Sequence, residues 1–117
     1  MNIEEKIKLI VGALEDVKAR EISVLDTSKL TSMFERMVIA SGDSNRQTRA
    51  LADKVREKMK EAGEHVGGIE GEETGDWVLL DLGDVIVHVM LPAIRAHYNL
   101  EELWGAGATV RVRSSIA

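Results

Sequence analysis

The segment from Trp77 to Met90, "WVLLDLGDVIVHVM", constrains the fold more than any other part of the chain. Its pattern predicts two apolar strands joined at Leu82-Gly83, where glycine suits the positive φ angle of a tight hairpin. The second strand is apolar on both sides apart from His88, which is typical of a central strand with both faces covered. We assign to the core the three residues that share one side of that strand, Val85, Val87 and Val89.

Three aspartates and His88 lie in or beside these strands, and they allow two interpretations. A phosphoryl-transfer site needs carboxylates that share a divalent ion, and i, i+2 spacing along a strand would place two of them on one side. Asp76, Asp81 and Asp84 do not have that spacing. Asp81 and Asp84 bracket a turn, where aspartate is common. The pattern alone leaves open a catalytic set and a surface that docks on a partner.

Two helices are predicted upstream of the hairpin. An apolar stripe at helical spacing runs from Ile3 to Val17. The second helix begins after Ser44, an N-cap that forms a capping-box pattern with Gln47, and it ends at Gly63. Its buried stripe is predicted to consist of Leu51, Val55, Met59 and Ala62.

The remaining segments predict an α/β protein. Further strands are predicted at 21–26, 33–40 and, more weakly, 65–71. Pro92 suits the first turn of a helix, and Asn99 suits a break in it. The order α-β-β-α-β-β-β-α predicts a single-domain α/β fold, a mixed sheet of about five strands flanked by helices. We expect residues 1–104 to form the domain and 105–117 to form a tail, either an edge strand or a frayed end.

Composition narrows the class of function. The 117 residues include no cysteine, which excludes disulfides and thiolate metal sites, and their formal net charge is −5. Such a domain lacks the basic field that draws proteins to phosphate backbones, so no sequence-specific binding to nucleic acid is expected. No apolar run approaches the roughly 20 residues of a membrane helix, and the acidic, periodic start is unlike a signal peptide. We therefore expect a soluble, cytoplasmic protein.

Other candidate sites have less support in the sequence. His65, His88 and His97 share no tight ligand spacing, which disfavours a zinc site. The turn Gly42–Arg46 opens a helix, and helix N-termini bind anions, but neither a P-loop nor a dinucleotide fingerprint is present. The runner-up interpretation is a nucleotidyltransferase-like, nucleotide-binding enzyme with its anion site in this turn. A homodimeric scaffold is a third alternative.

Three segments, taken together, are specific enough to indicate a family. They are "DWVLLDLGDVIVHVM", "GDSNRQTRALADKV" and "RAHYNLEELW". The first is nearly the signature hairpin of the Iojap-related ribosomal silencing factor family, and the other two are similar to that family's Gly-x-Ser-x-Arg segment and to its last helical segment. The resemblance extends from about Ile3 to Trp104. It implies a fold similar to the nucleotidyltransferase core, without catalysis and without a cofactor.

The resemblance also implies a partner and a docking surface. Members of the family bind the fourteenth protein of the large ribosomal subunit, on the face that meets the small subunit. Occupying that face blocks subunit joining and represses translation under nutrient limitation. The residues carried over as partner-binding surround the hairpin and the final helix: Trp77, Asp81, Leu82, Asp84, His88, Met90, Tyr98, Leu100 and Trp104. Sequence alone does not separate docking from packing among them.

Two features depart from the family pattern. The family often has a glutamate before the final helix, where this chain has "LPAI" from Leu91 to Ile94, so the resemblance does not fix how that helix starts. The tail extends further past Trp104 than the family pattern does. Its Arg111 and Arg113 are candidate contacts to RNA or to a second copy of the chain.

Overall fold

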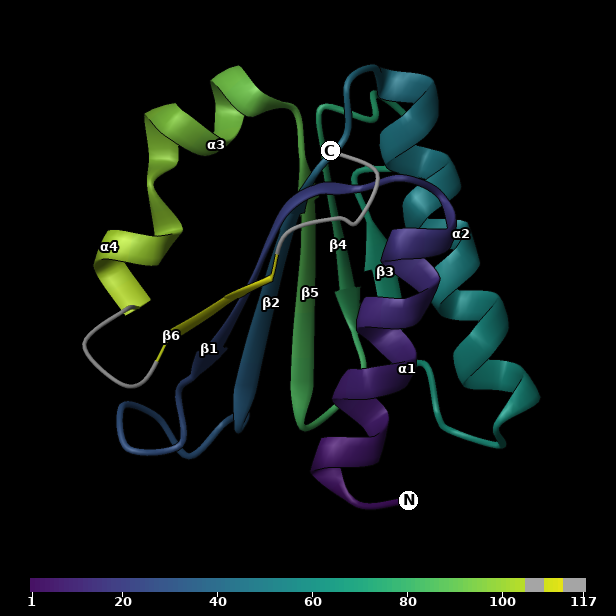
Figure 1. The fold of residues 1–117 in the computed structure, drawn as a ribbon, viewed down its shortest axis with the longest axis vertical. Helices are drawn as coiled ribbons and strands as arrows, with labels where there is room; N and C mark the ends of the chain where they lie inside the picture. Colours follow the sequence, from purple (N-terminus) through teal and green to yellow (C-terminus); the bar gives the residue numbers. More distant parts are fainter. Residues whose placement is uncertain (105–108, 113–117) are drawn as a thin grey trace.

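A mixed β-sheet forms the centre of the computed structural model, which describes residues 1–104 and the backbone of residues 109–112 (Figure 1). The strands are β1 (Arg20–Asp26), β2 (Arg36–Ser41), β3 (Gly68–Glu70), β4 (Trp77–Asp81), β5 (Val85–Met90) and β6 (Thr109–Val112). The helices are α1 (Ile3–Asp16), α2 (Asn45–Glu61), α3 (Pro92–Tyr98) and α4 (Leu100–Trp104). The predicted mixed α/β fold is confirmed.

The strand order is β3-β4-β5-β2-β1-β6, and only β2 and β5 pair in parallel among the described strands. β6 comes from the tail and pairs with β1, so the described sheet has one strand more than the five expected. The side chain of Arg111 and the whole of Arg113 lie outside the described residues, and the contacts predicted for them stay untested.

The two faces of the sheet are covered by different helices. α1 and α2 pack on one face (Figure 1), and the main core lies between these helices and the sheet. Because side chains alternate along a strand, β5 contributes to that core only the side chains on one of its two faces. Val85, Val87 and Val89 are fully buried in it, as predicted. α3 and α4 pack on the opposite face, where Ile94, Leu100 and Trp104 contact a smaller core.

The predicted boundaries of α2 are correct in outline. The Ser44 hydroxyl accepts a hydrogen bond from the Gln47 N–H at 3.1 Å, which is the expected N-cap. The Gln47 side chain reaches one residue further back than in a capping box, since its Oε1 accepts from the Asp43 N–H. Gly63 adopts a φ of 76° and follows the end of the helix. The assignment of Ala62 to the buried stripe is wrong, because Ala62 is the exposed C-cap.

The predicted strand 33–40 is also partly wrong, because β2 begins only at Arg36. Residues 27–35 form a loop in which the Met33 N–H donates to the Thr31 hydroxyl oxygen at 3.1 Å. This local bond replaces a strand pairing, as hydroxyl side chains often do. Met33 is 81% exposed, so its apolar side chain does not belong to the sheet.

Local signals fixed the hairpin and the start of α3. Gly83 has a φ of 86°, and the Leu82 N–H donates to the Val85 carbonyl at 2.9 Å, which closes the turn. Pro92 is the first residue of α3, and Asn99 ends it in the left-handed conformation with a φ of 45°. The predicted break at Asn99 is confirmed, and it separates α3 from α4.

Candidate functional site

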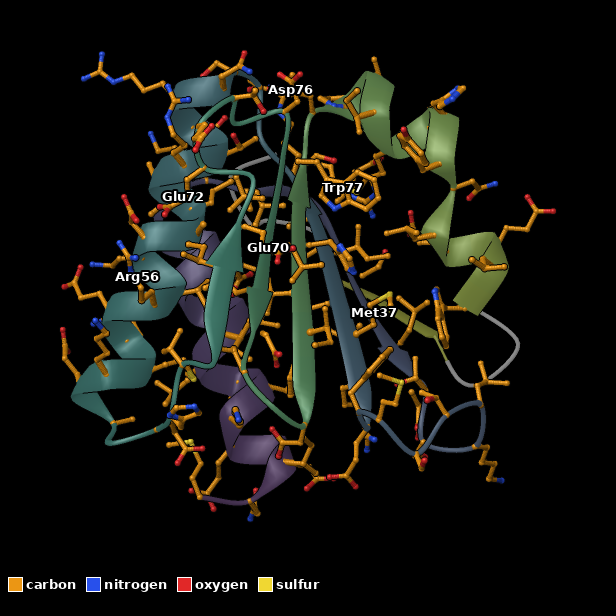
Figure 2. All side chains as sticks on the ribbon, turned by 180° about the vertical axis from the view of Figure 1, so that it is seen from behind. Met37, Arg56, Glu70, Glu72, Asp76 and Trp77 are labelled. Atoms are coloured by element: carbon orange, nitrogen blue, oxygen red, sulfur yellow. The ribbon has the colours of Figure 1, made fainter. Side chains whose placement is uncertain are left out.

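The face of the sheet opposite α1 and α2 is only partly covered by α3 and α4. Seen from behind in Figure 2, α3 and α4 lie to one side, and no helix stands in front of the strands from β3 to β5. Trp77, Leu79 and Ile86 are half-buried on this face, and Asp81 is exposed. We call these four residues the open face. Two of them, Leu79 and Ile86, were not among the predicted site residues, although alternation along β4 puts Leu79 on the side of Trp77 and Asp81.

Trp77 is the centre of an aromatic cluster at one end of this face. Its indole Nε1–H donates to Nδ1 of His88 at 2.9 Å. The Tyr98 ring from α3 lies 4.8 Å from the Trp77 ring, centroid to centroid, and the planes are tilted by 49°. Tyr98 itself is 54% exposed, which is unusual for a large aromatic residue that already has a packing partner. The cluster thus forms a partly exposed aromatic surface with a fixed geometry.

His88 is held neutral by its surroundings. It is buried on β5 between the neighbouring strands, where it pairs with Ile39 of β2 and Leu79 of β4. Burial lowers the pKa of His88 from 6.5 to about 4. Because Nδ1 accepts the indole hydrogen, the imidazole proton resides on Nε2. His88 is therefore an acceptor that orients Trp77, and it belongs to no cluster of three or more potential metal ligands among the described residues.

The nine predicted site residues fall into three groups by exposure. Asp81 and Tyr98 are exposed. Half-buried are Trp77, Asp84, Leu100 and Trp104. Leu82, His88 and Met90 are buried, so their side chains have no surface of their own to offer a partner. Seven of the nine lie on the face opposite α1 and α2, whereas Leu82 packs in the main core and Asp84 pairs with Lys6 of α1.

Asp84 is bound within the fold by a residue that the sequence analysis missed. The Lys6 ammonium of α1 is buried and lies 2.6 Å from Oδ1 of Asp84, and it also donates to the Leu82 carbonyl at 2.8 Å. Charge-assisted bonds of this kind fasten the hairpin turn to α1. The spacing of Lys6 within a helical stripe gave no signal of this, since its partners are 76 and 78 residues away.

A second missed residue, Arg95, fastens α3 and α4 to the sheet. Its guanidinium is buried and makes a two-pronged contact with Glu101, with Nε 2.9 Å from Oε1 and Nη2 3.1 Å from Oε2. The same group donates to the hydroxyls of Ser41 at 3.0 Å and Ser23 at 3.1 Å. One side chain thus joins both short helices to β1 and β2, which sets the position of Tyr98.

An exposed apolar strip continues from this cluster toward the loop 27–35. Trp104 of α4 packs against Phe34 with ring centroids 5.5 Å apart. Beside them, Met33 and Leu103 are exposed, the latter by 70%. Exposed apolar side chains that gather in one place mark interaction surfaces more often than scattered ones do.

The polar groups of the turn Gly42–Arg46 are largely engaged with residues outside the turn. Asp43 pairs with Arg20 at 3.2 Å, and its N–H donates to Gln47. The Asn45 amide donates to the carboxylate of Asp76 and to the carbonyl of Thr74. The carboxylates of Asp43 and Asp76, one at each end, make this turn poorly suited to bind a phosphate. The runner-up interpretation requires a phosphate site at this turn.

No helix within residues 1–104 is long and apolar enough to cross a lipid bilayer.

Comparison with known proteins places the chain in a family. A family model described as "Ribosomal silencing factor during starvation" matches residues 1–116. A ribosomal silencing factor of Chromobacterium violaceum is 60% identical over 105 residues, which cover 90% of this chain and 86% of the relative. A crystal structure of a C. violaceum protein superposes with a TM-score of 0.89 at 55% identity, covering 98% of this chain and 97% of that one.

A more distant relative from Mus musculus is named "Mitochondrial assembly of ribosomal large subunit protein 1". It is 33% identical over 101 residues, which cover 84% of this chain but 44% of the relative. These matches define the class of protein as ribosome-associated regulators of the silencing-factor type. The chain belongs to the ribosomal silencing factor family, which confirms the resemblance carried by its three sequence segments.

Proposed function

We propose that this protein represses translation in the cytoplasm under nutrient limitation by binding the large ribosomal subunit through that subunit's fourteenth protein. Binding there keeps the small subunit from joining. The observation that carries the proposal is the aromatic cluster of Trp77 and Tyr98 beside the open face, since aromatic residues held rigidly at a surface are typical anchors of protein interfaces. The name of the mouse relative, which refers to the large subunit, points in the same direction.

The nine carried-over residues divide into contacts and supports in this proposal. Trp77, Asp81, Tyr98, Leu100 and Trp104 have exposed or half-exposed side chains and would touch the partner. Leu82, Asp84, His88 and Met90 are buried or bound internally and would hold the contacting residues in place. An interface of this kind has an apolar centre with a charged rim, which is the usual anatomy of a protein–protein contact.

Charge and size fit the proposed mechanism. A domain of formal net charge −5 is attracted to a basic ribosomal protein, which speeds encounter and helps to fix orientation. The body measures 32 × 32 × 28 Å along its principal axes. A rigid object of that thickness, seated on the face where the subunits meet, leaves no room for the small subunit, so repression requires no chemistry.

Co-sedimentation with isolated ribosomal subunits tests the proposal. The protein should pellet with large subunits at one copy per subunit and should not pellet with small subunits. Its addition should reduce the fraction of joined ribosomes in a sucrose gradient. The matched control is Tyr98→Ala, which should leave subunit joining unaffected. Failure of the wild-type protein to pellet with large subunits across several salt concentrations would refute the proposal.

A further inference from the structure

The strand β3 ends the sheet, and its outer edge is open. No other described strand pairs with β3 besides β4. Gly67, Gly68 and Glu70 are exposed, and a Cβ placed on Gly68 would meet no atom within 4 Å. The unpaired N–H and C=O groups of such an edge are a template for a further strand from another chain.

The chain segment that contains this edge carries charge of only one sign, and Arg56 of α2, which lies on the same side of the molecule (Figure 2), pairs with Asp53. From Glu61 to Ile94 the chain contains no lysine or arginine. The same stretch contains Glu61, Glu64, Glu70, Glu72, Glu73, Asp76, Asp81 and Asp84. Lys58 and Lys6, from outside the stretch, pair with Glu61, Glu64 and Asp84. The carboxylates in or next to β3, those of Glu70, Glu72 and Glu73, form no ion pair with any described residue.

The register of β3 aligns this charge with the edge. Gly68 pairs with Asp81, and Glu70 pairs with Leu79, so Glu70 and Asp81 lie on the same face of the sheet. Ile69, between them, points to the face covered by α1 and α2 and packs against the main core. A strand added beside β3 would therefore place side chains on this face next to Glu70, with Asp81 one strand further away across Gly68.

We propose that the β3 edge binds an extended, lysine- and arginine-rich segment of another protein as an additional strand of the sheet. Backbone hydrogen bonds would supply the pairing, and the carboxylates of Glu70 and Asp81 would select basic side chains. The same charge disfavours two other occupants. Nucleic acid is repelled by it, and a second copy of this chain would bring its own acidic β3 to the contact. The inference goes beyond docking on the large subunit and rests mainly on β3 and Glu70, since Asp81 is the one residue that it shares with the proposed docking surface.

The test uses the isolated protein and a short synthetic peptide of alternating lysine and valine. A fluorescein-labelled peptide is titrated with protein, and binding is followed by fluorescence anisotropy at low and high salt. A peptide with glutamate in place of every lysine is the matched probe. The lysine peptide should bind and should slow hydrogen exchange at the backbone amides of residues 68–70. The glutamate peptide should not bind.

A charge reversal at the edge separates local recognition from overall attraction. Glu70→Lys should weaken binding of the lysine peptide about tenfold or more, because the substitution places like charges side by side at the contact. Glu57→Lys, on the exposed side of α2, makes the same change in net charge and should alter affinity by less than about twofold at moderate salt. Both side chains are exposed, so both variants should keep the wild-type circular dichroism.

Three results would each overturn the inference. They are equal weakening by the two variants, binding without protection of residues 68–70, and absence of binding to the lysine peptide at low salt. Because no ribosome is present in this experiment, its failure would leave the proposed docking on the large subunit unaffected. Failure of co-sedimentation would likewise leave this inference unaffected.

Discussion

The two faces of the sheet differ in the side chains that they present, and the difference separates stability from recognition. The face under α1 and α2 is aliphatic, with Val38, Leu80 and Val87 fully buried. The opposite face carries His88 and Ser41, and the half-buried Trp77. An aliphatic layer tolerates any packing that fills the space, whereas buried polar groups require particular partners. The second face is therefore the one whose geometry is specified closely enough for the proposed docking.

The sharpest test of this division compares two adjacent leucines of β4. Leu80→Ala should lower the free energy of unfolding by about 2–5 kcal/mol, because it leaves a cavity in the fully buried core. Leu79→Ala, on the open face, should cost less than about half of that, since Leu79 is only half-buried. Urea denaturation followed by circular dichroism measures both values.

The same pair should reverse its order in ribosome binding. At a temperature where both variants are folded, Leu79→Ala should reduce pelleting with large subunits, and Leu80→Ala should not. Equal loss of binding for both leucines would show that the two faces do not divide these roles.

The next largest effect on stability is expected when the pH is lowered. The pKa of His88 is lower in the folded protein than in the unfolded chain, so between these values the unfolded chain binds more protons. Stability should therefore be complete above pH 6.5 and should fall as the pH drops toward 4, by about 3 kcal/mol if burial is maintained throughout. Urea midpoints measured across this range give the slope.

Two histidine variants isolate the source of that slope. His88→Gln, which keeps an acceptor for the Trp77 indole, should remove the His88 contribution to the pH dependence. His97→Gln makes the same substitution at an exposed histidine and serves as the matched control. An unchanged slope in His88→Gln would assign the acid sensitivity to other groups.

A smaller effect on stability, but a clear one on binding, is expected at Tyr98. Tyr98→Ala should change the free energy of unfolding by less than about 1 kcal/mol, because the side chain is half exposed, yet weaken large-subunit binding about tenfold or more. Trp77→Ala should also weaken binding but should lose more stability, since Trp77 packs against His88 and Tyr98. If Tyr98→Ala melts like a core truncation, Tyr98 is structural.

The smallest effect is expected at Asp81. Its Oδ1 accepts a hydrogen bond from the Gly83 N–H at 2.9 Å, so Asp81→Ala loses both a charge and a turn contact. Asp81→Asn keeps an oxygen acceptor and loses only the charge. If the charge contacts the partner, both variants should weaken binding a few-fold, more at low salt than at high salt. If only the alanine variant loses binding, and does so at every salt concentration, the role of Asp81 is limited to forming the turn.

Local signals in the sequence predicted most of the fold. Gly83, Pro92 and Asn99 act through their own backbone preferences, and each lies where the sequence placed it. The strand expected at 33–40 was partly wrong because its first residues are apolar, while a hydroxyl of the preceding loop redirects the chain. Apolar character alone does not distinguish an exposed contact such as Met33 from a core residue.

The supports of the site could not be predicted in this way. Lys6 and Arg95 are both buried, and both bind partners more than 50 residues away in sequence, which the three-dimensional fold alone brings together. A lysine in an amphipathic helix and an arginine in a short one normally extend into water. Trp77 and Tyr98 were singled out from the sequence as candidate docking residues, and the structure adds why they hold a fixed geometry.

The parallel pairing of β2 with β5 has a consequence for how the chain reaches this fold. Antiparallel neighbours such as β1 and β2, or β4 and β5, are close in sequence and can pair early. The parallel pairing of β2 with β5 joins Arg36 to Val85, which is far along the chain, so it forms later. During synthesis the N-terminal hairpin therefore emerges with the apolar edge of β2 unpaired, and it stays so until β5 is made. The parallel pairing therefore forms late, although the pairing of β1 with β6 joins residues still further apart in sequence. The incomplete chain is most prone to aggregate while the edge of β2 lacks its partner.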